Sequence, residues 1–163
     1  MQNTGPGAGA EAVRMWGKWV DSEGDIAVAT TWERKVNPGV TVQEIEQAFA
    51  SVAAEDNVKM VGEFFVSREL EARSGKPEQF LKIYSFCNPL LAKEMVAFSP
   101  NMAAFLPCRI AVLEKEDGLW IYTMNMDMLI KMGRQLPPDL AMSALRMRQT
   151  LQKMLEKGAQ GDF

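Results

Sequence analysis

The stretch from Ile83 to Leu113 (IYSFCNPLLAKEMVAFSPNMAAFLPCRIAVL) constrains the fold of this chain more than any other. Its apolar start suits the end of a buried strand. Asn88 is placed to cap a helix whose first turn holds Pro89, a position where the missing N–H of proline costs nothing. A Ser-Pro pair stops that helix, and a second strand follows Pro107. The stretch is therefore predicted to fold as strand, helix, bend and strand.

Both cysteines of the chain lie at the ends of these two predicted strands. Cys87 comes directly before the helix, where backbone N–H groups and the positive end of the helix dipole lower the pKa of a thiol. Cys108 opens the second strand. We expect the two thiols to lie close enough to share one ligand or one bond, with Cα atoms within about 7 Å if bonded. Adjacent strand residues face opposite sides of a sheet, so Arg109 assists Cys108 only if it points inward.

The segments FCNPLLA and FLPCRIAVLEKEDG carry a family resemblance. Cys-Asn-Pro is followed about twenty residues later by Leu-Pro-Cys-Arg, and then by a strand and an acidic-Gly turn. With this pattern the chain resembles, over roughly Ala27 to Met132, the family catalogued as domain of unknown function 302. The resemblance implies a compact α+β domain that is often dimeric, and it implies no activity and no catalytic residue.

Composition excludes several classes of protein. The 163 residues include no His, which removes the commonest general base and the commonest metal ligand, and with them His-centred triads and imidazole zinc sites. A net charge of −3 does not provide the basic face of a nucleic-acid binder. No run of about 20 apolar residues is present, so no membrane span is predicted.

The start of the chain, MQNTGPGAGAEA, is polar and rich in glycine. We predict a flexible N-terminal arm over residues 1–20 and a single α+β domain over residues 21–163. Within the arm, residues 12–20 are compatible with a short helix or with a continuation of the arm. The same start fits a secretory protein whose signal has been removed and a cytoplasmic protein with a mobile end. Between these, we favour a periplasmic location over a cytoplasmic one.

The remaining pattern alternates strands with helices. Strands are predicted over residues 26–36, 58–67, 79–86, 108–113 and 119–123. Helices are predicted from a Thr41–Glu44 capping box to about residue 56, over 89–98 and 125–133, loosely over 68–76, and from Pro137 to a closing Gly158. The turn at Glu116–Gly118 requires an antiparallel pair. A two-layer α+β domain is therefore predicted, with a mixed or antiparallel sheet and its helices mainly on one face.

The last predicted helix carries an apolar stripe, which packs on a sheet or on a copy of itself. Its members are Leu140, Ala144, Met147, Leu151 and Met154. Together with the family resemblance, this stripe leads us to predict a homodimer. The tryptophans are interpreted as buried residues or as the lining of a pocket or a dimer interface; they are Trp16, Trp19, Trp32 and Trp120.

Methionines form a second candidate cluster at alternate positions. Thioethers are soft ligands that, with Cys, select Cu(I) or ligate haem iron axially. If the stretch is extended, Met124, Met126 and Met128 share one face, and core packing is the competing interpretation. The candidate metal ligands are therefore Cys87, Cys108, Met124, Met126 and Met128.

Three functions are compatible with these patterns. The first is a small soluble binding or carrier domain for a soft ligand, namely a sulfur species, Cu(I) or a noncovalent haem-like cofactor. Its predicted ligand-binding residues are Cys87, Asn88, Pro89, Pro107, Cys108 and Arg109. The second is a thiol redox enzyme or sensor, with Cys87 as nucleophile and Cys108 as resolving thiol. The third is a structural dimer module without chemistry.

Overall fold

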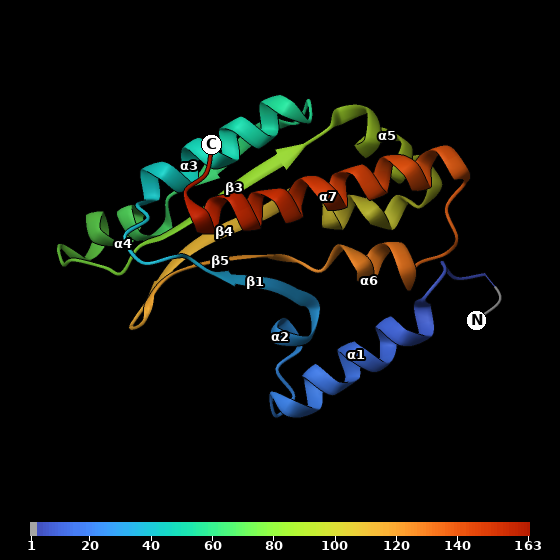
Figure 1. The fold of residues 1–163 in the computed structure, drawn as a ribbon, viewed down its shortest axis with the longest axis horizontal. Helices are drawn as coiled ribbons and strands as arrows, with labels where there is room; N and C mark the ends of the chain where they lie inside the picture. The colour runs from blue at the N-terminus through green and yellow to red at the C-terminus, as the bar shows by residue number, and fades with distance from the viewer. Residues whose placement is uncertain (1–2) are drawn as a thin grey trace. The chain divides into compact units, whose positions relative to one another are not determined.

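The computed structural model describes residues 3–163 (Figure 1). The helices are α1 (Ala8–Asp21), α2 (Ile26–Thr30), α3 (Val42–Glu55), α4 (Val66–Ser74), α5 (Pro89–Phe98), α6 (Met126–Lys131) and α7 (Pro138–Gln160), with a 3₁₀ turn, η1, at Pro100–Phe105. The strands are β1 (Thr31–Lys35), β2 (Lys59–Phe64), β3 (Leu81–Cys87), β4 (Cys108–Lys115) and β5 (Gly118–Met124). Within the described residues, no helix is both long and apolar enough to cross a membrane.

The five strands form one sheet in the order β1-β5-β4-β3-β2. The pairs β2–β3, β3–β4 and β4–β5 are all antiparallel, and the turn before Gly118 joins the last of them as predicted. Helices and antiparallel strands therefore build an α+β domain, which confirms the predicted fold class.

The chain divides into two compact units, each described here by itself. Unit 1 comprises Met1–Trp32 and Met124–Gln149, and unit 2 comprises Glu33–Thr123 and Thr150–Phe163. Within unit 1, helix α1 packs with α6. The predicted boundary at residue 20 stays a prediction.

Unit 2 holds most of the sheet and a core on one of its faces. The side chains of Tyr84 and Phe86 alternate with half-exposed neighbours along β3, which is the expected pattern for a strand covered on one side. Helix α3 begins at the predicted capping box, in which Thr41 and Glu44 bond each other's backbone N–H groups. Its Phe49 packs edge-on against the rings of Tyr84 and Phe86, with centroids 5.4 and 6.2 Å away.

The predicted end of the last helix is wrong at Gly158, because α7 continues to Gln160. A Cβ atom at Gly158 would lie 2.9 Å from both Ile121 Cδ1 and Phe49 Cε1. The glycine therefore serves the close packing of α7 between α3 and β5, and it does not cap the helix.

The predicted apolar stripe of α7 is buried within a single chain at every position. A stripe already covered by its own chain gives no reason to expect a second copy on it. The homodimer stays a prediction, now without this argument.

The predicted strand over residues 26–36 is wrong in its first half, which forms α2. Asp25 caps this helix by accepting hydrogen bonds from the N–H groups of Ala27 and Val28. The hydroxyls of Thr30 and Thr31 donate to backbone carbonyls four residues earlier, both at 2.7 Å. Local side-chain bonds of this kind outweigh the β propensity of threonine.

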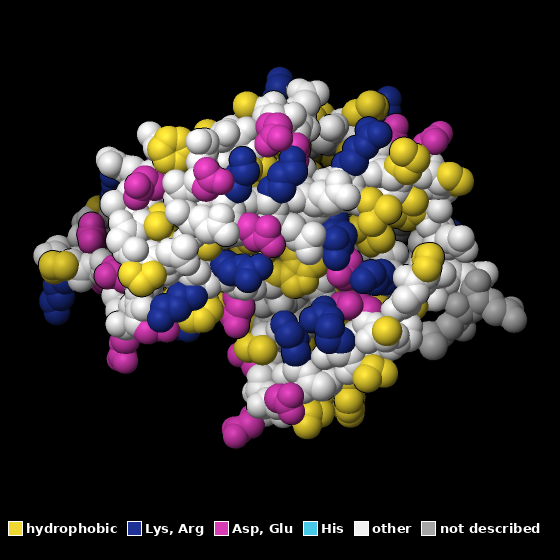
Figure 2. Space-filling view, in the orientation of Figure 1, with side chains coloured by type: hydrophobic (Ala, Val, Ile, Leu, Met, Phe, Trp, Pro, Cys, Tyr) yellow, Lys and Arg dark blue, Asp and Glu magenta, His cyan; other side chains and the backbone are white. Residues whose placement is uncertain are grey.

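Unit 1 contains α1, which agrees with the short helix that was one of the two alternatives for residues 12–20. Residues 8–21 form a continuous helix, and its Glu11 is 4% exposed. The opposite side of α1 is apolar and open to solvent, and the apolar side chains along it are visible at the bottom of Figure 2. Trp16, which is 64% exposed, packs on Trp19 with a centroid distance of 5.0 Å. Burial therefore does not account for these two tryptophans.

Candidate functional site

The structure places the two cysteines on neighbouring strands but on opposite faces of the sheet. Cys108 is buried and pairs with Phe86 across the ladder, whereas Cys87 is the next residue along β3 and pairs with Lys59. Because side chains alternate along a strand, the two thiols point to different sides. Both cysteines are free, and no disulfide joins them.

The expected lowering of the Cys87 pKa is contradicted. Burial raises the pKa of Cys87, and it raises the pKa of Cys108 to about 11, with the nearby Cys87 adding to the rise and Arg109 opposing it. At the start of α5, moreover, Asn88 Oδ1 accepts from the N–H groups of Leu90 and Leu91. The donors that stabilise a thiolate at a helix N-terminus are therefore already engaged.

The other predicted ligand-binding residues lie next to the cysteines along the chain, and their role in binding stays a prediction. Asn88 and Pro89 begin α5 as predicted. Pro107 follows Leu106 through a cis peptide bond and precedes β4. Arg109 is exposed and pairs with Ser85 across the ladder.

The predicted methionine face is not formed. Met124 ends β5, whereas Met126 begins α6, so the stretch is not extended from 124 to 128 and its alternation is lost. Asn125 causes the change of structure by capping α6 through the N–H of Asp127. Among residues 3–163, no group of three or more Cys, Asp or Glu side chains is placed to hold a metal ion.

A different site is present in unit 2, which we call the α3 pocket. It is a cavity of about 430 Å³ between α3 and the strands β2 and β3. Its lining residues are Glu46, Phe49, Ala50, Ala53, Ala54, Val58, Met60, Glu63, Tyr84 and Phe86. The alanines leave the space because a helix that presents Cβ atoms alone cannot fill the groove beside a sheet.

Charged side chains gather at one end of the α3 pocket, and we call them the Glu46 cluster (Glu46, Glu63, Lys82 and Tyr84). Glu46 Oε1 accepts from Lys82 Nζ and from the Tyr84 hydroxyl, each at 2.7 Å. Lys82 Nζ also lies 3.0 Å from Glu63 Oε1. The cation is the inner member, with 12% of its side chain exposed, whereas the side chains of Glu46 and Glu63 are 36% and 44% exposed.

The pKa values of Glu46 and Lys82 favour the charged forms of these two side chains. Burial opposes the charge on Glu46, but the hydrogen bonds from Lys82 and Tyr84 outweigh it and hold the pKa of Glu46 below 4.5. Burial likewise opposes the charge on Lys82, and the two carboxylates outweigh it and raise the pKa of Lys82. At neutral pH the cluster therefore carries two negative charges and one positive charge.

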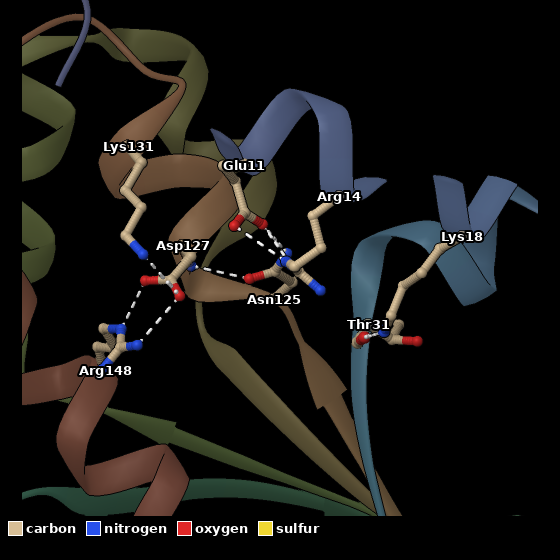
Figure 3. Close-up of polar contacts among 8 residues, drawn as sticks. All are labelled: Glu11, Arg14, Lys18, Thr31, Asn125, Asp127, Lys131 and Arg148. Carbon is tan, nitrogen blue, oxygen red and sulfur yellow. Dashed lines mark hydrogen bonds and ion pairs between the residues drawn. The ribbon is translucent and has the colours of Figure 1, made fainter. Parts of the chain in front are cut away.

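Unit 1 holds a second charged group, which we call the Asp127 cluster (Glu11, Arg14, Asn125, Asp127, Lys131 and Arg148; Figure 3). Asp127 Oδ1 lies 2.6 Å from Arg148 Nε, and Oδ2 lies 3.0 Å from Arg148 Nη2 and 3.2 Å from Lys131 Nζ. Glu11 pairs with Arg14 through both carboxylate oxygens and accepts from Asn125 Nδ2 at 2.6 Å. Every carboxylate oxygen of this cluster is therefore in use.

Sequence reasoning missed both clusters. The α3 pocket does leave a signal, because Ala50, Ala53 and Ala54 follow Phe49 at helical spacings of one face. Glu11 leaves none, since a glutamate in a glycine-rich start is typical of a solvated segment.

The fold defines a small α+β domain, an antiparallel sheet with helices packed on it. The chain belongs to the family described as "Domain of unknown function DUF302", whose family model matches residues 32–158.

Among solved structures the chain is similar to the uncharacterized conserved protein DUF302 from Bacillus stearothermophilus. That match has a TM-score of 0.62 and 20% identity, and it covers 78% of this chain and 97% of the other. At this identity the likeness extends to the fold alone. No curated protein matches the chain.

Proposed function

We propose that this protein is a small binding or carrier domain whose ligand site is the α3 pocket. The observation that carries the proposal is the cavity of about 430 Å³ with apolar walls and one charged end. Sites for small molecules are mostly apolar cavities of about 300–1,000 Å³ in which a few polar groups orient the ligand.

Binding of the neutral fluorophore prodan tests this function. We expect saturable enhancement and a blue shift of its emission with the native protein, because the apolar walls exclude water from the bound dye. In the pocket variant Ala50→Leu/Ala54→Leu, the added side chains fill the cavity, and we expect affinity to fall at least about tenfold. Both alanines are exposed on α3, so the change leaves the core packing intact.

The matched control is Gln47→Leu, which adds the same side chain to an exposed position of α3 outside the pocket lining. It should bind prodan as the native protein does. Failure of the native protein to bind, or equal binding by the filled variant, would overturn the proposal.

The cysteines support a second candidate, a site for a soft ligand such as a sulfur species, Cu(I) or a haem-like cofactor. The supporting observation is that Cys87 follows Phe86, the residue that pairs with Cys108 across the ladder, so both cysteines lie at the same end of their strands. If the pair binds Cu(I), Cys87→Ser abolishes uptake of that metal at little cost in stability. If the thiol only packs, Cys87→Ser lowers the free energy of unfolding by about 1–3 kcal/mol and changes no uptake.

The redox alternative, with Cys87 as nucleophile and Cys108 as resolving thiol, requires an activated thiolate. The raised pKa values of both thiols weigh against it. We expect alkylation of Cys87 to accelerate steeply between about pH 6 and pH 8.5, as for an unactivated thiol. Equal rates at both pH values would instead favour the redox function.

The structural alternative is a homodimer without chemistry. The exposed apolar side of α1, with Trp16 and Val13, now supports it better than α7 does. Light scattering at micromolar concentration separates a dimer from the monomer mass of 18.2 kDa.

A further inference from the structure

The carboxylates of the α3 pocket retain unused acceptor oxygens. In the part of the chain that the structure describes, the hydrogen bonds and ion pairs of Glu46 and Glu63 all fall on their Oε1 atoms. Oε2 of each side chain remains free to accept. Since both side chains are more than one-third exposed, an incoming group can reach them from solvent.

The charge at this end of the α3 pocket determines whether a cationic or an anionic ligand is favoured. Two carboxylates face the single ammonium group of Lys82, which is already bonded to both. That ammonium group also lies 4.9 Å from the ring centre of Tyr84 and 5.2 Å from that of Phe65. The local charge of −1 attracts a cation and repels an anion.

The apolar walls of the α3 pocket favour a ligand with an apolar chain or ring. Ala50, Ala53 and Ala54 form one side, and Phe86 and Met60 form the other. These side chains offer no hydrogen bond to a polar ligand, and burying one there without a partner costs about 1–3 kcal/mol per polar group. An apolar chain or ring gains about 0.8 kcal/mol for each CH₂ group that it buries.

We propose that the α3 pocket binds an apolar primary amine, with its ammonium group bonded to Glu46 and Glu63 and its chain or ring between α3 and Phe86. This proposal rests on the proposed function, since it names the ligand class of the same pocket. The ammonium group donates to the free Oε2 atoms, and its charge brings the pocket end to neutrality. Lys82 keeps its own bonds and holds the two carboxylates in place.

Three probes with the same eight-carbon chain test the proposal by calorimetric titration at pH 7: octylamine, octanol and octanoate. We expect octylamine to bind at least about tenfold more tightly than octanol, and octanoate to bind most weakly. High salt should reduce the preference for the amine, because part of it is electrostatic attraction at an exposed site.

The variant Glu63→Gln should lower octylamine affinity by about fivefold to tenfold and leave octanol affinity unchanged, because it removes one charge and keeps the side-chain shape. Glu94→Gln, a change of the same type at an exposed position of α5, should leave all three affinities unchanged.

Equal affinity of the native protein for octylamine and octanol, or tighter binding of octanoate, would overturn the amine proposal and leave the α3 pocket as a binding site. Absence of binding by all three probes and by prodan would overturn the proposed function as well. An amine preference that Glu63→Gln leaves intact would also contradict the proposal, because the cation would then be bound elsewhere.

Discussion

The Asp127 cluster and the Glu46 cluster use the same kinds of side chain in opposite arrangements. In the Asp127 cluster the carboxylates are the inner members: Glu11 is 4% and Asp127 11% exposed, and half-exposed cations surround them. In the Glu46 cluster the cation Lys82 is inside and the carboxylates border a cavity. A buried carboxylate must have its oxygens satisfied, whereas an exposed one can keep an oxygen for a ligand. The first arrangement therefore stabilises unit 1, and the second leaves carboxylate oxygens beside a cavity.

The largest change in stability is expected for Asp127→Ala, which tests the role of the Asp127 cluster. It should lower the free energy of unfolding by about 3 kcal/mol, because Arg148 and Lys131 lose the partly buried anion that they share. Urea denaturation measures the change, and Asp162→Ala, at an exposed position near the C-terminus, is the control. A loss below about 1 kcal/mol would mean that the Asp127 cluster behaves as a surface ion pair.

The next test compares a glycine in each unit. Gly158→Ala should cost about 2 kcal/mol, because the new methyl group overlaps Ile121 and Phe49, and Phe49 also lines the α3 pocket. Gly17→Ala, in α1, has no atom within 4 Å of its added Cβ and should stabilise the protein by about 0.5–1 kcal/mol. Thermal unfolding measures both changes, and stabilisation by Gly158→Ala would contradict the packing described for α7.

The pH dependence of stability is a smaller test. Bonding to Arg14 holds the pKa of Glu11 below its ordinary 4.5; burial raises the pKa of Asp127, but bonding to Arg148 and Lys131 outweighs it and holds that pKa below 3.8. Each depressed pKa adds stability that is complete above the unfolded-state value and is lost as pH falls through the folded-state value.

We therefore expect the free energy of unfolding to decrease as pH falls below about 4.5. Asp127→Asn should flatten this decrease more than Glu46→Gln does, since Asp127 is the more buried carboxylate. Chemical denaturation at a series of pH values measures the slopes. A steeper slope in Asp127→Asn would show that its native carboxylate does not titrate in this direction.

The smallest effect is expected for Glu63→Gln in the absence of ligand. An exposed ion pair contributes about 0–1 kcal/mol, and Lys82 keeps its bond to Glu46, so stability should change by less than about 0.5 kcal/mol. Urea denaturation measures this change in stability. A loss comparable to that of Asp127→Ala would mean that the Glu46 cluster also holds the fold together.

Local signals of the sequence predicted much of the fold. The capping residues Thr41 and Asn88, the turn at Gly118 and the buried stripe of α7 act over a few neighbouring positions, so each can be read without knowing the rest of the chain. The strand predicted over 26–36 was wrong because Asp25 starts a helix there, although a capping aspartate is itself a local signal.

The candidate site depended on contacts that are distant along the chain. Cys87 and Cys108 were identified as neighbours, but the register that pairs Cys108 with Phe86 sends their side chains to opposite faces. Asn88 caps α5 as predicted, but burial raises the pKa of the Cys87 thiol, and burial depends on side chains that the fold packs around it.

Local propensity and a short motif were enough to predict the α+β class, most helix starts and the family to which the chain belongs. The positions of the charged clusters and of the α3 pocket, by contrast, depend on the tertiary structure. Glu46 and Lys82 are 36 residues apart, and Glu11 and Asn125 are 114 apart. No local pattern encodes such pairs, since burial and sheet register set which side chains share an environment. That is why the pocket, and not the cysteine pair, became the candidate site.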